Sequence, residues 1–128
     1  MTNLGTVSII EEDFLNIKKI TFAWTSVDSG GDAGKAAKTT VNNYTGEVIR
    51  LVTIPGTVGD QPSDNYNVIV LDSSGVDILM SNGLLRDQTS PEQVPQSLLG
   101  CVVDSKLTLS VNSAGNAKKG IVYLYIRG

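Results

Sequence analysis

Residues 44–56 read YTGEVIRLVTIPG, and this stretch decides the fold class. A turn-forming start and a Pro-Gly stop enclose residues 47–54, whose β-branched and apolar composition is typical of a strand. That segment contains one arginine, Arg50, among five aliphatic residues: Val48, Ile49, Leu51, Val52 and Ile54. A strand that is apolar on both faces belongs in the middle of a covered sheet, or in a sheet whose outer face meets another subunit.

The rest of the chain repeats the period of two that strands require, with breaks at Gly, Pro, Asn, Asp and Ser. We predict strands at about 5–10, 16–26, 38–43, 47–54, 66–72, 76–80, 98–103, 106–112 and 119–127. Nine strands is an upper count. Segments 28–37 and 55–65 are predicted as long loops, and helix is limited to a short piece near residues 90–100. The sequence therefore predicts an all-β antiparallel β-sandwich, jelly-roll or immunoglobulin-like, with about eight strands and little helix.

Alternation within the predicted strands indicates which side chains form the core. In 18–24 it sets Ile20, Phe22 and Trp24 on one face and Lys19, Thr21 and Ala23 on the other. The expected core also includes Val68, Val70, Leu107, Leu109 and Val111. Segments 106–112 and 119–127, joined by a glycine-containing turn, are predicted to form a hairpin.

Composition argues against catalysis. The 128 residues contain no histidine and one cysteine, Cys101, so the usual general base and nucleophile pairs are missing. DSGGD at 28–32 and DSSGVD at 72–77 lack the ligand count of calcium loops and are ordinary turn chemistry. We expect no enzyme activity, no cofactor and no metal.

The sequence also argues against nucleic acid and a membrane as partners. The net charge is −3, from 10 basic and 13 acidic residues, and no long basic face indicates nucleic acid. The N-terminus has neither a signal peptide pattern nor a membrane span. We expect no membrane partner.

A second strand, IVYLYIR at 121–127, shares the two-faced apolar character of 47–54. In a small sandwich only one face of each sheet meets the core, so these strands predict self-association through their outer faces. The expected interface residues are Ile49, Arg50, Leu51, Tyr123, Tyr125 and Arg127, with the two arginines as partners in interface ion pairs.

Four segments carry a resemblance to a known group: ITFAWTS (20–26), NNYTGEVIRLVTIPG (42–56), DNYNVIVLDSSGVDIL (64–79) and KLTLSVNSAGNAKKGIVYLYIRG (106–128). Their succession resembles small virion structural proteins of tailed bacteriophages, of the capsid decoration or cement type, over about residues 17–127. The resemblance implies a homotrimer that binds the major capsid protein of the same virus on the capsid surface and stabilises the shell. It implies synthesis in the host bacterial cytoplasm and location in the virion, and it brings no catalytic motif.

Residues 1–15 lie outside that resemblance, so we divide the chain into an N-terminal segment, 1–15, and a sandwich domain, 16–128. The segment has two possible fates: pairing within its own sheet, or adding to a strand of a neighbour. The second fate would make it a capsid-binding arm, with contacts expected from Val7, Ile9, Glu11, Glu12 and Asp13.

Other functions stay open at this point. A phage tail or head-to-tail structural component belongs to the same class. A carbohydrate-binding or adhesion module also fits a small sandwich, although the chain has one tryptophan and only 5% aromatic residues. An enzyme is the least supported alternative.

Overall fold

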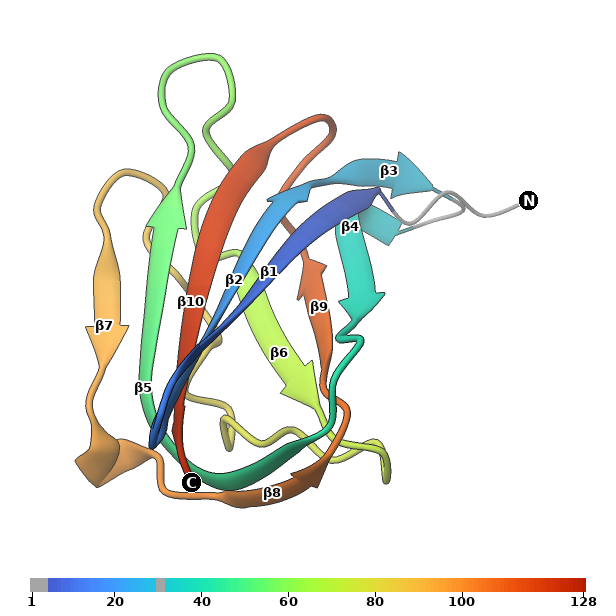
Figure 1. Cartoon of the computed structure of the whole chain (residues 1–128). Helices are drawn as coiled ribbons and strands as arrows, with labels where there is room; N and C mark the ends of the chain where they lie inside the picture. The colour runs from blue at the N-terminus through green and yellow to red at the C-terminus, as the bar shows by residue number, and fades with distance from the viewer. Residues whose placement is uncertain (1–4, 30–31) are drawn as a thin grey trace.

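The fold is a sandwich of two antiparallel sheets, seen in a computed structural model that describes residues 5–29 and 32–128 (Figure 1). The ten strands are β1 (Thr6–Phe14), β2 (Ile17–Thr25), β3 (Val27–Ser29), β4 (Asp32–Thr39), β5 (Tyr44–Pro55), β6 (Asn67–Leu71), β7 (Glu92–Val94), β8 (Val102–Ser105), β9 (Thr108–Asn112) and β10 (Lys119–Arg127). A single 3-10 turn, η1 (Gln96–Leu98), is the helical content of the described residues. The predicted class is confirmed, and the upper count of nine strands is one too low.

The larger sheet has six strands in the order β1-β2-β10-β5-β7, and β8 pairs with the first residues of β5. Its centre is β10, which pairs with β2 along its whole length and with β5 on the other side. The two strands predicted to be apolar on both faces, β5 and β10, are therefore neighbours in the middle of one sheet. This is the arrangement that their composition favours.

The smaller sheet has the order β3-β4-β9-β6. β9 pairs with β4 and β6, whereas β10 lies in the larger sheet. The predicted hairpin between 106–112 and 119–127 is therefore wrong. The turn between β9 and β10 carries the chain from one sheet to the other, so two strands that are adjacent in sequence face each other across the core.

The core fills the space between the sheets and confirms the predicted inner faces. All eight residues that alternation assigned to the core are at most 1% exposed: Ile20, Phe22, Trp24, Val68, Val70, Leu107, Leu109 and Val111. Trp24 packs against Tyr66, the residue before β6 of the smaller sheet, with 5.6 Å between the ring centroids. Gly120 lies opposite Trp24 on β10, and its missing side chain leaves the space that the indole fills.

Two local predictions were wrong. The segment predicted as a loop, 28–37, contains the paired strands β3 and β4, although residues 30–31 lie outside the described part. Segment 76–80 is a series of turns with one isolated bridge, Leu71 to Asp77, instead of a strand. Segment 90–100 holds η1, the short helical piece expected there, together with the strand β7. Among the described residues, no helix is long and apolar enough to cross a membrane.

The N-terminal strand takes the first of its two fates. β1 pairs antiparallel with β2 at nine positions, from Thr6 opposite Thr25 to Phe14 opposite Ile17. Residues 6–14 thus form an edge of the larger sheet of their own chain, and in this structure they do not extend away as an arm.

Candidate docking surface on the six-stranded sheet

The side of the six-stranded sheet that points away from the core is the candidate functional surface, and we call it the outer face. Antiparallel register sets its side chains in rows across β1, β2, β10 and β5. The three central rows are Glu12–Lys19–Tyr125–Arg50, Ile10–Thr21–Tyr123–Val52 and Ser8–Ala23–Ile121–Ile54. Lys119 extends the face at one end, and Arg127, opposite Glu47, extends it at the other.

Apolar side chains make up much of this face. Ile10 is 57% exposed, Ala23 is exposed, and Val52, Ile54 and Ile121 are half-buried. Aliphatic groups at neighbouring positions of a sheet form a continuous patch, which on a soluble protein is typical of a contact surface. The outer face therefore has the composition of a protein-docking surface.

The structure places four of the six predicted interface residues on the outer face, namely Arg50, Tyr123, Tyr125 and Arg127. The prediction that Leu51 lies at the interface was wrong, because its side chain is fully buried in the core. The reason is a β-bulge, since Tyr125 pairs with Arg50 and the next residue, Ile126, pairs with Val48. Ile49 is the extra residue and is half-buried at the bulge. The inward positions of β5 are therefore Val48 and then Leu51, three residues later.

A cluster of cations and aromatic rings occupies the row next to the bulge. Lys19 Nζ lies 4.3 Å from the ring centroid of Tyr123 and 5.8 Å from that of Tyr125. Arg50 Cζ lies 5.3 Å from the ring centroid of Tyr125. Tyr125 is thus approached by two cations from neighbouring strands, an arrangement that the ring quadrupole stabilises. Lys19 was not among the predicted site residues, although alternation had already set it on this face.

The cations of the outer face have no ion-pair partners in the described part of the chain. Within residues 5–29 and 32–128, none of Lys19, Arg50, Lys119 and Arg127 forms an ion pair, and Arg50 donates from Nε to Gln93 Oε1 at 3.2 Å. Elsewhere Lys18 pairs with Asp13 at 3.0 Å. Four positive charges on a partly apolar surface therefore have unused capacity to bind carboxylates.

Two hollows indent this side of the molecule. One, of about 400 Å³, lies at the Lys119 end and is lined by Ala23, Ile54, Ile121 and the start of the 55–65 loop. The other, of about 230 Å³, lies at the β5–β7 edge beside Arg50 and Val52. A surface with hollows beside exposed aliphatic groups can interlock with protruding side chains of a partner.

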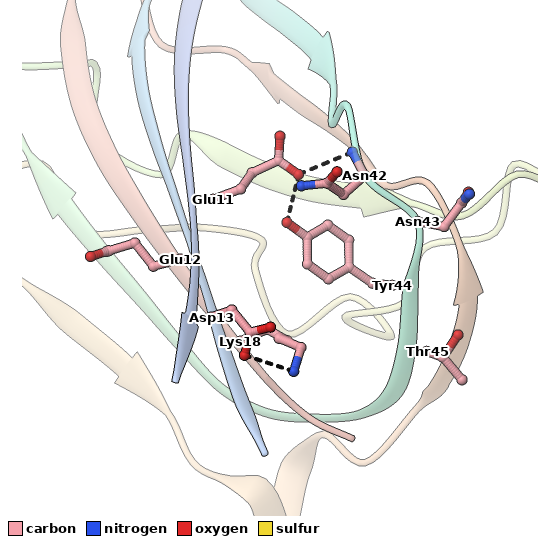
Figure 2. Close-up of a pocket in the computed structure, with 8 residues that line it drawn as sticks. All are labelled: Glu11, Glu12, Asp13, Lys18, Asn42, Asn43, Tyr44 and Thr45. Atoms are coloured by element: carbon pink, nitrogen blue, oxygen red, sulfur yellow. Dashed lines mark hydrogen bonds and ion pairs between the residues drawn. The ribbon is translucent and has the colours of Figure 1, made fainter. Parts of the chain in front are cut away.

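A third cavity, of about 520 Å³, lies beside Glu11 at the end of β1 (Figure 2). The Glu11 carboxylate bridges β1 to the turn before β5. It accepts hydrogen bonds from the Val41 N–H (3.1 Å), the Asn42 N–H (3.2 Å) and the Tyr44 hydroxyl (2.6 Å). Burial alone would raise the pKa of Glu11, but these hydrogen bonds together outweigh it and lower the pKa.

These contacts correct part of the predicted capsid contact. Val7 is part of the core and is 6% exposed, and Ile9 packs against the core. The Glu11 carboxylate accepts a hydrogen bond from Tyr44 of the same chain. Their side chains have internal partners instead of external ones. Glu12 and Asp13 keep exposed side chains, and Asp13 pairs with Lys18.

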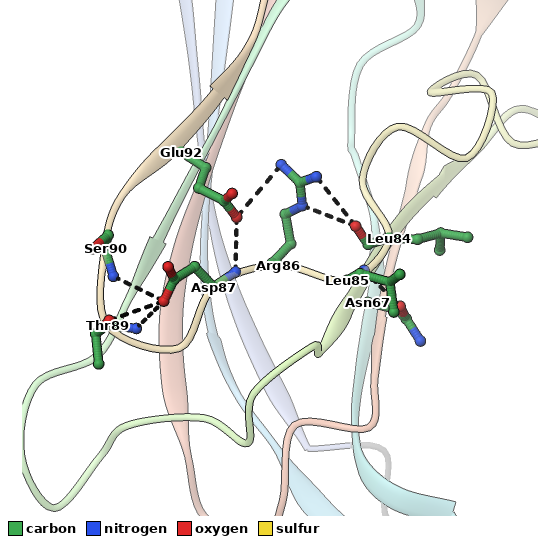
Figure 3. A network of polar contacts seen from close by, with 8 residues as sticks. All are labelled: Asn67, Leu84, Leu85, Arg86, Asp87, Thr89, Ser90 and Glu92. Carbon is green, nitrogen blue, oxygen red and sulfur yellow. Dashed lines mark hydrogen bonds and ion pairs between the residues drawn. The ribbon is translucent and has the colours of Figure 1, made fainter.

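A polar network fixes the short edge strand β7 beside the outer face (Figure 3). Arg86 lies 3.8 Å from Glu92 and donates from Nε and Nη2 to the Leu84 carbonyl. Glu92 also accepts the Asp87 N–H at 2.7 Å, and the Asp87 carboxylate accepts the Thr89 N–H at 2.8 Å. The segment between β6 and β7 is thus tied to the sheet edge, which keeps Gln93 beside Arg50.

The remaining acidic residues that could suggest chemistry are engaged in turns. Asp72 accepts the N–H groups of Ser74 and Val76 at 2.9 and 3.1 Å, and Asp77 accepts those of Leu79 and Ser81 at 3.0 and 2.9 Å. This is the turn chemistry that their sequence predicted. No group of three or more Cys, Asp or Glu side chains suited to a metal ion occurs in the described part of the chain.

Cys101 is partly buried, and desolvation, with smaller contributions from Asp72 and Asp77, raises the pKa of its thiol. A raised pKa disfavours the thiolate that nucleophilic chemistry needs.

Comparison of the chain with protein-family models and with curated proteins gives no match.

Proposed function

We propose that this chain is a structural protein of a tailed-bacteriophage virion, of the capsid decoration or cement type. In this role it binds the outer capsid surface, contacts the major capsid protein and further copies of itself, and stabilises the shell. The proposal begins from the sequence resemblance. The one structural observation that supports it is the outer face, which combines aliphatic side chains, shallow hollows and cations that form no ion pair within the described residues.

An assembly role fits this surface better than a reaction does. A decoration protein needs complementary surface, and many equivalent weak contacts on a lattice give high avidity without a deep pocket. Three carboxylates with several hydrogen bonds each, Glu11, Asp77 and Asp87, accept backbone N–H groups of their own chain and so stabilise turns.

Carbohydrate binding is the alternative from another class. Tyr123 and Tyr125 lie together on a sheet face, as sugar-stacking rings do. Lys19 and Arg50, however, approach these rings within 4.3 and 5.3 Å of their centroids, so each ring already has a cation as its neighbour. This observation favours a charged protein contact over sugar stacking.

Quantitative mass spectrometry of purified virions tests the proposal. A decoration protein is present in a copy number comparable to that of the major capsid protein. A handful of copies per particle would move the assignment to the tail or connector, and absence from washed virions would contradict the proposed function.

A direct binding assay complements this count. The purified chain should co-sediment with shells that lack it and raise the temperature at which those shells break open. Shells that neither bind the chain nor gain stability would count against a cement role.

A further inference from the structure

Asn82 and Gly83 lie next to each other in the turns between β6 and β7. The Asn82 N–H donates to the Leu79 carbonyl at 3.0 Å, and the Val68 N–H of β6 donates to the Gly83 carbonyl at 2.8 Å. Among the asparagines of the chain, Asn82 is the one that a glycine follows. The contacts of the two residues explain why the fold places this pair here.

The Asn82 side chain joins two parts of the chain that are 16 residues apart. Its Nδ2 group donates to the Leu79 carbonyl at 3.0 Å and to the Leu98 carbonyl at 2.8 Å. Leu98 is the last residue of η1, where carbonyl groups have no partner within the helix. An amide nitrogen with two N–H donors suits this task, so hydrogen bonding favours asparagine at position 82.

Gly83 is required by its contact with β6. A Cβ at this position would overlap the carbonyl oxygen of Val68. The backbone thus approaches β6 more closely than a side chain permits, which is a common reason for glycine. Space therefore selects glycine at position 83, directly after the asparagine that hydrogen bonding selects.

An asparagine before a glycine can react with its own backbone, and asparagine is among the thermolabile residues of proteins. The nitrogen of the following residue attacks the side-chain Cγ, and glycine hinders this attack least because it has no side chain. Within the part of the chain that the structure describes, no hydrogen bond uses the Gly83 N–H. The attacking nitrogen is therefore not engaged elsewhere.

We propose that Asn82 is a site of spontaneous covalent modification by deamidation. The Gly83 nitrogen forms a bond to Cγ of Asn82, the Cγ–Nδ2 bond breaks, and the proton of the Gly83 N–H leaves with the departing ammonia. Water then opens the resulting succinimide ring at either carbonyl, which leaves aspartate or isoaspartate at position 82. The inference concerns the chain by itself and does not rest on the proposed virion role.

Either product breaks the link between the turns and η1. A carboxylate cannot donate, so the Leu79 and Leu98 carbonyls lose their partner and face a negative charge instead. Isoaspartate in addition lengthens the main chain between positions 82 and 83, because the backbone then runs through the former side chain. This displaces Gly83 from Val68. Deamidation therefore frees η1 from the turns beside β6.

Peptide mapping by mass spectrometry tests the site. The full-length chain is incubated at mildly alkaline pH, in its native state and in urea, and the converted fraction of each asparagine is followed with time. We expect position 82 to lose its amide before any other asparagine in both samples, and more slowly in the native chain because two hydrogen bonds hold the amide. Another asparagine that converts first, or a native chain that never converts at position 82, would overturn the proposal.

Asn82→Asp reproduces one product and tests the consequence by hydrogen exchange. The N–H groups of Leu98 and Leu99 donate backbone hydrogen bonds at η1. We expect these two groups to exchange faster in Asn82→Asp, and Tm to fall by several degrees. Asn43→Asp is the matched control, with the same charge change at an exposed asparagine whose side chain makes no hydrogen bond among the described residues. If Asn82→Asp matches this control in both measurements, the link to η1 is wrong.

Discussion

Leu51 and Val52 are adjacent residues on opposite faces of β5, and replacing each by alanine tests the register of the sheet. Leu51 is 0% exposed and lies opposite Leu124 of β10 and Val94 of β7. Val52 is half-buried on the outer face, opposite Tyr123. The two variants therefore remove similar groups from two different environments.

The expected costs follow from burial. Leu51→Ala removes a fully buried side chain and leaves a cavity, which typically costs about 2–5 kcal/mol of unfolding free energy. Val52→Ala removes two methyl groups that are already half in water, which costs about 1 kcal/mol. A loss of about 3 kcal/mol corresponds to a fall of roughly 10 °C in Tm for a domain of this size.

Urea unfolding at one low protein concentration measures both values, because self-association would otherwise add a concentration-dependent term. We expect Leu51→Ala to shift the midpoint much further than Val52→Ala, with little change in slope. If Val52→Ala is equally or more destabilising, the bulge at Ile49 and the assignment of the outer face are both wrong.

Further predictions concern packing and pH. Gly120→Ala should destabilise the fold by about 1–3 kcal/mol in thermal unfolding, because a Cβ there would overlap the indole of Trp24, and unchanged stability would refute this packing. The lowered pKa of Glu11 means that its contribution to stability is present above its unfolded-state pKa and is lost as pH falls through its folded-state pKa. The stability of Glu11→Gln should therefore fall less than that of the original chain as the pH is lowered. Identical acid unfolding profiles of the two proteins would contradict this. Burial raises the pKa of Tyr66 to about 12 and raises that of Tyr44 further, so their contribution to stability is lost as pH rises from their unfolded-state pKa through these values. In an alkaline titration followed by tyrosinate absorbance, two tyrosines should ionise only together with unfolding, and four that ionise before it would refute this.

Alternation predicted the parts of the fold in which a strand runs without interruption. Ile20, Phe22 and Trp24 face the core because nothing interrupts the period of two in β2. In β5 the same argument fails after Val48, because one unpaired residue, Ile49, shifts the phase of everything that follows. A bulge is fixed by pairing with β10, and no local pattern in the sequence announces it.

Which strands pair with each other was the second feature that the sequence did not predict. The hairpin prediction for β9 and β10 assumed that strands adjacent in sequence are adjacent in a sheet, whereas this turn crosses between sheets. The glycine-rich segment 28–37 has the composition of a loop, yet β4 is held there by its pairing with β9. Long-range pairing outweighed local propensity in both places.

The candidate surface was partly predictable for the same reasons. Arg50, Tyr123 and Tyr125 were expected to point outward, and they do. Lys19 lay on the correct face of its strand, but only the pairing of β2 with β10 brings it beside the two tyrosines. Glu11 was assigned to an external partner as part of the acidic run 11–13. Its internal link to Val41, Asn42 and Tyr44 joins positions about 30 residues apart, which no local pattern in the sequence shows.

Chemical labelling of a cysteine placed in the outer face tests most directly whether this face is the docking surface. Ala23 is exposed near the centre of the face, so Ala23→Cys in a Cys101→Ser background gives a single reporter thiol, with Lys106→Cys in the same background as the matched control. We predict that the thiol at position 23 reacts rapidly with a maleimide in dilute protein and is strongly protected in the assembled protein, while the thiol at position 106 reacts equally in both. Equal reactivity of position 23 before and after assembly would contradict a docking role for the outer face.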